Sequence, residues 1–357
     1  MKIGKYEIKH PIIQGGMGVG ISWDKLAGTV SREGGLGVIS AVGTGYYKSD
    51  EYVIKTKKDK PVDVLNFYSK DALTTIIKNA RKICGDSPLA CNILYACNDY
   101  GRIVKDACEA GINIIITGAG LPTNMPEFTK DFPDVALIPI VSSARALKLI
   151  CKKWKRYNKL PDAVIVEGPK SGGHQGFTYE QCFQEEFQLE NIVPEVIEEA
   201  KNWENPPIIA AGGIWDKNDI DKFMDMGCSG VQMATRFIGT FECDADAEFK
   251  KVLLDAKEDD IKLMKSPVGL PARGVRTNLQ KSIEDGTAPK VVCISNCVAP
   301  CNRGVEAKLV GYCIADRLGA AYQGDRDTGL FFTGSNGYKI DKVISVHELM
   351  EKLTKGE

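Results

Sequence analysis

Residues 163–176 read AVIVEGPKSGGHQG, a short β-branched run that leads directly into a glycine-rich turn. An apolar run of this length is typical of a strand in a parallel sheet, because such strands are buried on both faces. Glycine at the end of the strand lets the backbone turn sharply and approach a ligand closely. This strand-and-turn unit determines the fold, because it recurs along the chain.

With this run, eight short apolar segments are predicted to be strands, at residues 11–13, 37–40, 89–93, 112–116, 136–141, 163–166, 207–211 and 230–233. Helical patterns lie between them, for example at residues 24–33 and 100–110, and Asp24 and Asp99 are expected to cap these two helices. Repeated alternation of strand and helix predicts an α/β fold, a (β/α)₈ TIM barrel. An open, doubly wound sheet is the alternative arrangement of the same elements.

The barrel is expected to occupy residues 1–243. Residues 44–70 are polar and lysine-rich, which predicts an insertion after the second strand, on the side where barrel enzymes place their active-site loops. Residues 244–357 predict a C-terminal extension that packs on the same face. No internal repeat other than the strand-helix unit is present.

Composition limits the class of protein. The chain has 46 basic and 47 acidic residues without a basic stripe or an acidic tail, so a nucleic-acid partner is not expected. The N-terminus lacks the apolar stretch of a signal peptide, and no segment approaches the roughly 18 apolar residues of a membrane span. These observations predict a cytoplasmic protein with no membrane segment, whose 12 cysteines are reduced.

The turn after the sixth strand is the first candidate site. Gly172 and Gly173 leave room for a flat or charged ligand, and His174 follows them. An imidazole can accept or donate a proton near neutral pH, so His174 is the candidate catalytic residue. A glycine-rich loop with a structurally hydrogen-bonded histidine is the alternative interpretation. His10 precedes the first strand and His347 lies in a terminal helical pattern, so neither is placed as well.

Two later turns predict a phosphate site. Gly212 and Gly213 follow the seventh strand, and Ala234 and Thr235 follow the eighth. Barrels often bind phosphate at these loops through backbone N–H groups. Simple tight turns are the alternative. Asn92 in the apolar third strand is a candidate for hydrogen bonding to a ring, with a satisfied core amide as its alternative.

No metal site is predicted. The chain has no His-x-x-x-His pair and no carboxylate cluster after the strands. Cys293, Cys297, Cys301 and Cys313 could hold zinc or an iron–sulfur cluster, but their spacing differs from the common patterns for either. We expect reduced thiols in a loop-rich cap.

Taken together, the motifs resemble those of the nitronate monooxygenase (2-nitropropane dioxygenase) family of FMN barrels, which includes the flavin-dependent type II enoyl-acyl-carrier-protein reductases. The resemblance extends over nearly the whole chain. It is carried by residues 11–18 (PIIQGGMG), 117–122 (TGAGLP), 167–176 (EGPKSGGHQG), 210–214 (AAGGI), 231–237 (VQMATRF) and 266–271 (SPVGLP).

The resemblance implies that FMN binds at the carboxyl ends of the barrel strands. Gly16 and Met17 would lie along the isoalloxazine, and Asn92, Thr117 and Gly118 would contact the ring or the ribityl chain. The ribityl and phosphate would be surrounded by residues of the later loops, namely Gly173, Gly212, Gly213, Ala234 and Thr235. His174 matches the active-site histidine of the family.

The implied function is oxidation of alkyl nitronates to carbonyl compounds and nitrite, with oxygen as the acceptor. An NAD(P)H-dependent flavin reductase of enoyl thioesters or quinones on the same fold is the main competing interpretation, so NAD(P)H is a candidate partner. A phosphate-binding aldolase or isomerase barrel and a non-catalytic flavin or metal sensor are two further hypotheses. The substrate is expected to be a small molecule, and a homodimer is a candidate assembly.

Overall fold

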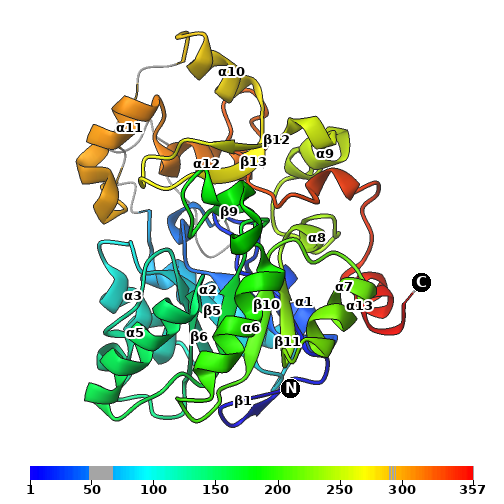
Figure 1. Ribbon diagram of the computed structural model, residues 1–357. Helices are drawn as coiled ribbons and strands as arrows, with labels where there is room; N and C mark the ends of the chain where they lie inside the picture. Colours follow the sequence, from blue (N-terminus) through cyan, green and yellow to red (C-terminus); the bar gives the residue numbers. More distant parts are fainter. Residues whose placement is uncertain (48–66, 289–290, 292, 294, 357) are drawn as a thin grey trace.

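Eight parallel strands form a barrel in chain order (Figure 1). The computed structural model describes residues 1–47, 67–288, 291, 293 and 295–356. The barrel strands are β3 (Ile12–Gln14), β4 (Gly37–Ser40), β5 (Leu89–Leu94), β6 (Ile114–Gly118), β7 (Ala136–Val141), β8 (Val164–Glu167), β10 (Ile208–Ala211) and β11 (Gly230–Met233). All eight predicted strands are therefore present, and their ends differ from the prediction by at most two residues.

Hydrogen bonds between the first and second strands close the sheet. The Gln14 N–H donates to the Leu36 carbonyl (3.0 Å), and the Leu36 N–H donates to the Ile12 carbonyl (2.9 Å). An open sheet would leave these edge groups unpaired. The predicted (β/α)₈ barrel is thus confirmed, and the doubly wound alternative is wrong.

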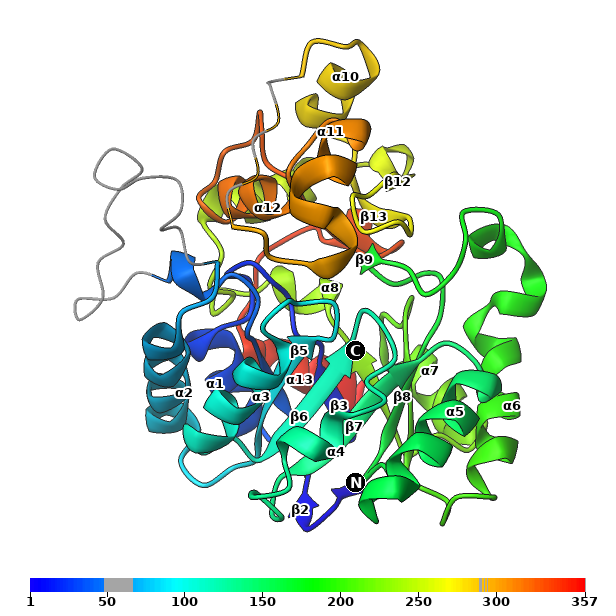
Figure 2. The ribbon, with the colours of Figure 1, turned by 90° about the vertical axis from the view of Figure 1, so that its left-hand side faces the viewer.

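Helices follow the first seven strands and surround the barrel (Figure 2). They are α1 (Asp24–Arg32), α2 (Lys70–Cys84), α3 (Tyr100–Glu109), α4 (Met125–Phe128), α5 (Ala144–Trp154), α6 (Leu189–Ala200) and α7 (Lys217–Asp225). Among the described residues, no helix has both the length and the apolar character needed to span a bilayer.

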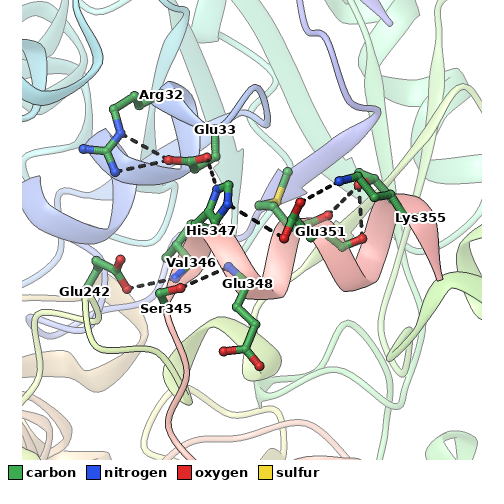
Figure 3. Close-up of polar contacts among 11 residues, drawn as sticks. Arg32, Glu33, Glu242, Ser345, Val346, His347, Glu348, Glu351 and Lys355 are labelled. Atoms are coloured by element: carbon green, nitrogen blue, oxygen red, sulfur yellow. Dashed lines mark hydrogen bonds and ion pairs between the residues drawn. The ribbon is translucent and has the colours of Figure 1, made fainter. Parts of the chain in front are cut away.

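The C-terminal helix completes this helical layer. After β11 the chain forms only the short α8 (Thr235–Ile238), and α13 (Val346–Lys355) packs against both α1 and α7. Figure 3 shows its attachment: His347 Nδ1 lies 2.8 Å from a Glu33 carboxylate oxygen, and the Val346 N–H donates to Glu242 (3.0 Å). The end of the predicted extension therefore belongs to the wall of the barrel.

Side chains alternate between the barrel interior and the helical layer, as the two faces of a strand require. On β6, Ile114 and Ile116 lie in the interior cluster, whereas Ile115 packs against the helices. A hairpin of β1 (Lys2–Ile3) and β2 (Tyr6–Glu7) adds the buried Ile3 and Ile8 to the interior cluster. Burying each such side chain contributes about 1.5–3 kcal/mol. The interior is a packed core, so a ligand site is confined to the ends of the barrel.

A cap, defined as residues 256–345 where described together with β9 (Gly173–His174), lies over the carboxyl ends of the barrel strands (Figures 1 and 2). Its sheet consists of β12 (Ile261–Met264), β13 (Ala272–Val275) and β9, all antiparallel. The helices of this region are α9 (Ala247–Asp255), which precedes the cap, and α10 (Asn278–Glu284), α11 (Val305–Val310) and α12 (Ile314–Tyr322). Most of the insertion predicted at residues 44–70 lies outside the described residues.

A distant aspartate caps α1. The Asp244 carboxylate accepts hydrogen bonds from the backbone N–H groups of Trp23 (2.7 Å), Lys25 (3.2 Å) and Leu26 (3.2 Å). Burial and the neighbouring Asp24 raise the pKa of Asp244 to about 7, although the three N–H donors favour its charged form. The prediction that Asp24 caps this helix was wrong, because Asp24 is the first residue within the helix.

We expect Asp244→Ala to lower the free energy of unfolding by about 2 kcal/mol, since three N–H groups at the start of α1 lose their buried acceptor. Asp216→Ala is the matched control, because Asp216 caps α7 locally through a single bond to the Asp219 N–H (3.0 Å). Loss of this one bond should lower the free energy of unfolding by about 1 kcal/mol. Urea denaturation monitored by circular dichroism measures both. Equal losses in the two variants would contradict a special contribution from Asp244.

Candidate active site

A cavity of about 1020 Å³ lies between the carboxyl ends of the barrel strands and the cap. That volume is at the upper end of the range for small-molecule sites, roughly 300–1,000 Å³. Ten of the eleven residues predicted for catalysis or cofactor binding line it: Gly16, Met17, Asn92, Gly118, Gly173, His174, Gly212, Gly213, Ala234 and Thr235. Residues at or just beyond the carboxyl ends of six strands thus meet at one site, as the barrel topology requires.

Thr117 is the residue that does not line this cavity. It is fully buried, and its hydroxyl lies 3.2 Å from the Tyr100 hydroxyl in the helical layer. The strand β6 continues to Gly118, so alternation turns Thr117 outward and Gly118 inward. The Thr117 side chain therefore faces away from the cavity, and Gly118 is the neighbouring residue that lines it.

His174 is held by other residues of the cap. Its Nε2 lies 2.7 Å from the Ser266 hydroxyl oxygen, which also accepts a hydrogen bond from the Val268 N–H (3.3 Å). The Phe332 ring stands edge-on to the imidazole, with ring centroids 5.4 Å apart. Protein atoms surround the imidazole except on its cavity side, and this burial lowers the pKa of His174 to about 4. At neutral pH the ring is uncharged, with one nitrogen able to donate and the other able to accept a proton.

The turns after β10 and β11 form a cradle. Gly212 and Gly213 have φ values of +103° and +86°, a backbone region that favours glycine. The first-turn N–H groups of α8 lack partners within the helix, as at any helix start. The Thr235 hydroxyl accepts a hydrogen bond from the Gly334 N–H (2.8 Å), and Asn336 donates to the Gly213 carbonyl (2.7 Å). The cap thereby fixes both turns in a shape suited to an anionic group.

Polar side chains form the floor of the cavity. Asn92, Glu167 and Gln232 point inward from β5, β8 and β11, and within the described part of the chain their side chains make no hydrogen bond to protein. Gly16 packs directly over Asn92, because a Cβ at Gly16 would lie 2.4 Å from the Asn92 Cβ. Amide and carboxyl groups that face a cavity without protein partners can bind a ligand that has its own donors and acceptors. The floor and the cradle together fit a planar heterocycle that carries a phosphate.

Several residues that line the cavity or contact His174 could not be assigned from the sequence. Ser266 lies within the SPVGLP motif that carries the family resemblance, but nothing in the sequence indicated its contact with His174. Glu167 and Gln232 stand at strand ends, where alternation could have identified them as inward-facing. Gly334 and Asn336 had no such signal, because only the folded cap brings them to the barrel.

The other histidines and most of the cysteines lie away from this site. His10 and His347 do not line the cavity. Cys297 does, and it packs against the two small apolar clusters that contain Cys301 and Cys313. All 12 cysteines are free thiols, and among the described residues no three His, Cys, Asp or Glu side chains converge on a metal-binding position.

Comparisons with known proteins agree on one family. The family model for nitronate monooxygenase matches residues 1–356. The chain is 29% identical over 285 residues to a probable nitronate monooxygenase of Staphylococcus saprophyticus, which covers 76% of this chain and 77% of the relative. It is 26% identical over 281 residues to an octahydro-1H-indene-4-carboxyl-CoA dehydrogenase of Rhodococcus jostii, over 78% of this chain and 65% of the relative. The structure of FabK from Thermotoga maritima matches with a TM-score of 0.72 at 27% identity, covering 98% of this chain and 93% of that chain.

Proposed function

The chain belongs to the nitronate monooxygenase family and is a flavin-dependent oxidoreductase, and on this premise we propose that it uses FMN to oxidise alkyl nitronates to carbonyl compounds and nitrite. Oxygen is the proposed acceptor. The observation that carries the proposal is the position of His174, whose neutral imidazole faces the same cavity as the polar floor and the glycine cradle.

The lining residues fit FMN. Gly16, Met17 and Asn92 would hold the isoalloxazine from the floor, while Gly212, Gly213, Ala234 and Thr235 would hold the ribityl phosphate at the cradle. When bound, FMN supplies the redox chemistry that no amino-acid side chain provides.

The protein itself would bind and orient the nitronate. An N–H of the neutral His174 can donate a hydrogen bond to a nitronate oxygen, which bears the negative charge. Ser266 fixes the imidazole orientation from the opposite side through the 2.7 Å contact with Nε2. The cap covers the carboxyl ends of the strands, where the proposed site lies.

An anaerobic visible spectrum tests the proposal. The purified protein should be yellow, and an alkyl nitronate should bleach the flavin band, whereas NADH in a parallel cuvette should not. A colourless protein that does not take up added FMN would refute FMN dependence. Bleaching by NADH alone would replace nitronate oxidation by the second candidate function.

We expect Ser266→Ala to lower kcat about 5- to 10-fold with little change in protein stability. The loss corresponds to one orienting hydrogen bond of about 1 kcal/mol. Steady-state kinetics with an alkyl nitronate measures it, and Ser266→Thr is the control, because it keeps the hydroxyl. A Ser266→Ala enzyme with the full kcat would show that the hydroxyl does not position His174.

The second candidate is an NAD(P)H-dependent reductase of enoyl thioesters. The Rhodococcus jostii relative is named for a carboxyl-CoA substrate. The cavity is large, and Val268, Leu270 and Leu318 of the cap add apolar surface along its wall, which suits an acyl chain. Membership of a flavin-dependent family removes the aldolase or isomerase hypothesis and the non-catalytic sensor hypothesis.

A further inference from the structure

The outer face of α5 carries a row of basic side chains. Residues 144–159 contain seven basic residues and no acidic one. The exposed members of this group at helical spacing are Arg145, Lys148 and Lys152 on α5 and Arg156 just after it. Within the described part of the chain, none of these four side chains forms an ion pair. This row, the α5 stripe, concentrates positive charge locally, so the expectation of a chain without a basic stripe does not hold for α5.

The loop between β9 and α6, residues 177–188, carries the opposite charge and is called the acidic loop below. Its exposed carboxylates are those of Glu180, Glu185 and Glu186, and they too form no ion pair with a described residue. Tyr179 and Phe183 stand on the same loop with 52% and 66% of their surface exposed, and their ring centroids are 5.3 Å apart. Exposed aromatic rings beside unpaired charges are typical of a protein–protein contact surface.

The α5 stripe and the acidic loop are neighbours on one side of the molecule. Gly176, directly before the loop, packs against Ser142 near the start of α5, because a Cβ at Gly176 would lie 2.2 Å from the Ser142 Oγ. The loop leads into α6, which packs against α5 (Figure 2). Of the eight large apolar side chains that are exposed in the described chain, four lie on these two segments, namely Leu149, Tyr157, Tyr179 and Phe183. Charge and apolar surface thus gather on the same side.

We propose that this side of the molecule is the interface of a homodimer, in which the α5 stripe of each protomer contacts the acidic loop of its partner. A two-fold axis between the two segments places each of them on the complementary segment of the other copy, so the same contact forms twice. Lysine and arginine side chains then face carboxylates, and the exposed rings of Tyr179 and Phe183 pack on α5 around Leu149. Aromatic rings also attract lysine and arginine cations directly.

The charge pattern favours a second copy of this chain over a polyanion such as nucleic acid. A polyanion bound along the α5 stripe would lie beside the three carboxylates of the acidic loop, which repel it, whereas a second copy pairs both segments. The partner would also stand beside the cavity, since Gln181 and Glu186 of the acidic loop line it. Dimer formation needs neither substrate nor turnover, so it is independent of the proposed reaction.

Sedimentation velocity of the purified full-length protein, as isolated, measures the dimer directly. We expect a monomer–dimer equilibrium in the micromolar range. Its Kd should rise at least about tenfold between ionic strengths of about 0.05 M and about 0.5 M, because salt screens the charges that pair across the interface.

Two charge-reversed variants test which surfaces meet. Lys148→Glu/Lys152→Glu makes the α5 stripe acidic, and Glu180→Lys/Glu185→Lys makes the acidic loop basic. Like charges then face each other at both contacts of either homodimer, so each variant alone should have a Kd at least about 100-fold above that of the wild type. In an equimolar mixture, both contacts again join opposite charges. The mixture should therefore form a heterodimer with nearly the wild-type Kd, a result that misfolded variants would not give.

Lys78→Glu/Lys105→Glu is the matched control, since it makes the same charge change at exposed lysines of α2 and α3 that form no ion pair with a described residue. It should keep the wild-type Kd. The proposal is overturned if the wild type stays monomeric throughout the micromolar range, if either reversed variant dimerises like the wild type, or if the mixture stays monomeric. A monomeric wild type that binds a DNA duplex through the α5 stripe would assign this surface to a polyanion instead.

Discussion

The His174→Ala enzyme should remain yellow and lose its turnover, with kcat for an alkyl nitronate about 10²- to 10⁴-fold below that of the wild type. The imidazole lies beside the cavity and is oriented by Ser266 at 2.7 Å, whereas the glycine cradle lies on other loops. Removing the imidazole therefore removes the group that faces the cavity and leaves the proposed phosphate-binding cradle intact. Steady-state kinetics and the visible spectrum of the purified variant separate these two effects.

His347→Ala is the matched control for this experiment. His347 lies on α13, with 64% of its side chain exposed, and its contacts are pairs with Glu33 and Glu351. Surface pairs of this kind contribute little to stability, so the control should keep both the cofactor and the activity. Full activity of His174→Ala would remove this histidine from the mechanism.

Gly212→Ala should weaken the binding of FMN at the proposed cofactor site. A Cβ at this position would lie 2.8 Å from the Gly168 carbonyl oxygen, which belongs to the backbone and cannot rotate away. The φ of +103° adds a strain of about 1–2 kcal/mol for any residue with a side chain. Relieving both requires the turn after β10 to move, which displaces the N–H groups proposed to hold the phosphate. We expect the FMN affinity to fall at least about tenfold, as measured by fluorescence titration of the apoprotein.

Gly111→Ala is the control that separates backbone strain from steric crowding by the added Cβ. Gly111 also has a positive φ, +87°, but a Cβ there would meet nothing within 4 Å, and the residue lies at the amino end of β6, away from the cavity. Its substitution should lower the free energy of unfolding by about 1 kcal/mol without changing the FMN affinity. Equal FMN affinities for Gly212→Ala and wild type would rule out the cradle as the phosphate site.

The sequence by itself determined the barrel and the location of its chemistry. Short, continuous apolar runs form stable strands only where other parts of the protein cover both faces of the strand. Eight such strands that alternate with helices are compatible with few folds. The carboxyl ends of parallel strands meet at one end of the barrel, so residues in the turns after these runs can be predicted to share a site. His174, Gly212 and Thr235 do line one cavity. The local pattern carries this information, because periodicity and glycine turns are properties of neighbouring residues.

Tertiary structure decided the contacts that set the chemistry. Asp24 has the local sequence of a helix cap, but Asp244 takes the N–H groups of α1 because the chain returns there after β11. Thr117 follows an apolar run and yet faces the helices, since β6 extends two residues further than predicted. The neutral state of His174 depends on its burial within the cap, and its orientation depends on Ser266, 92 residues along the chain. The burial of a side chain and its long-range contacts depend on residues that are distant in the sequence, so no local sequence pattern predicts them.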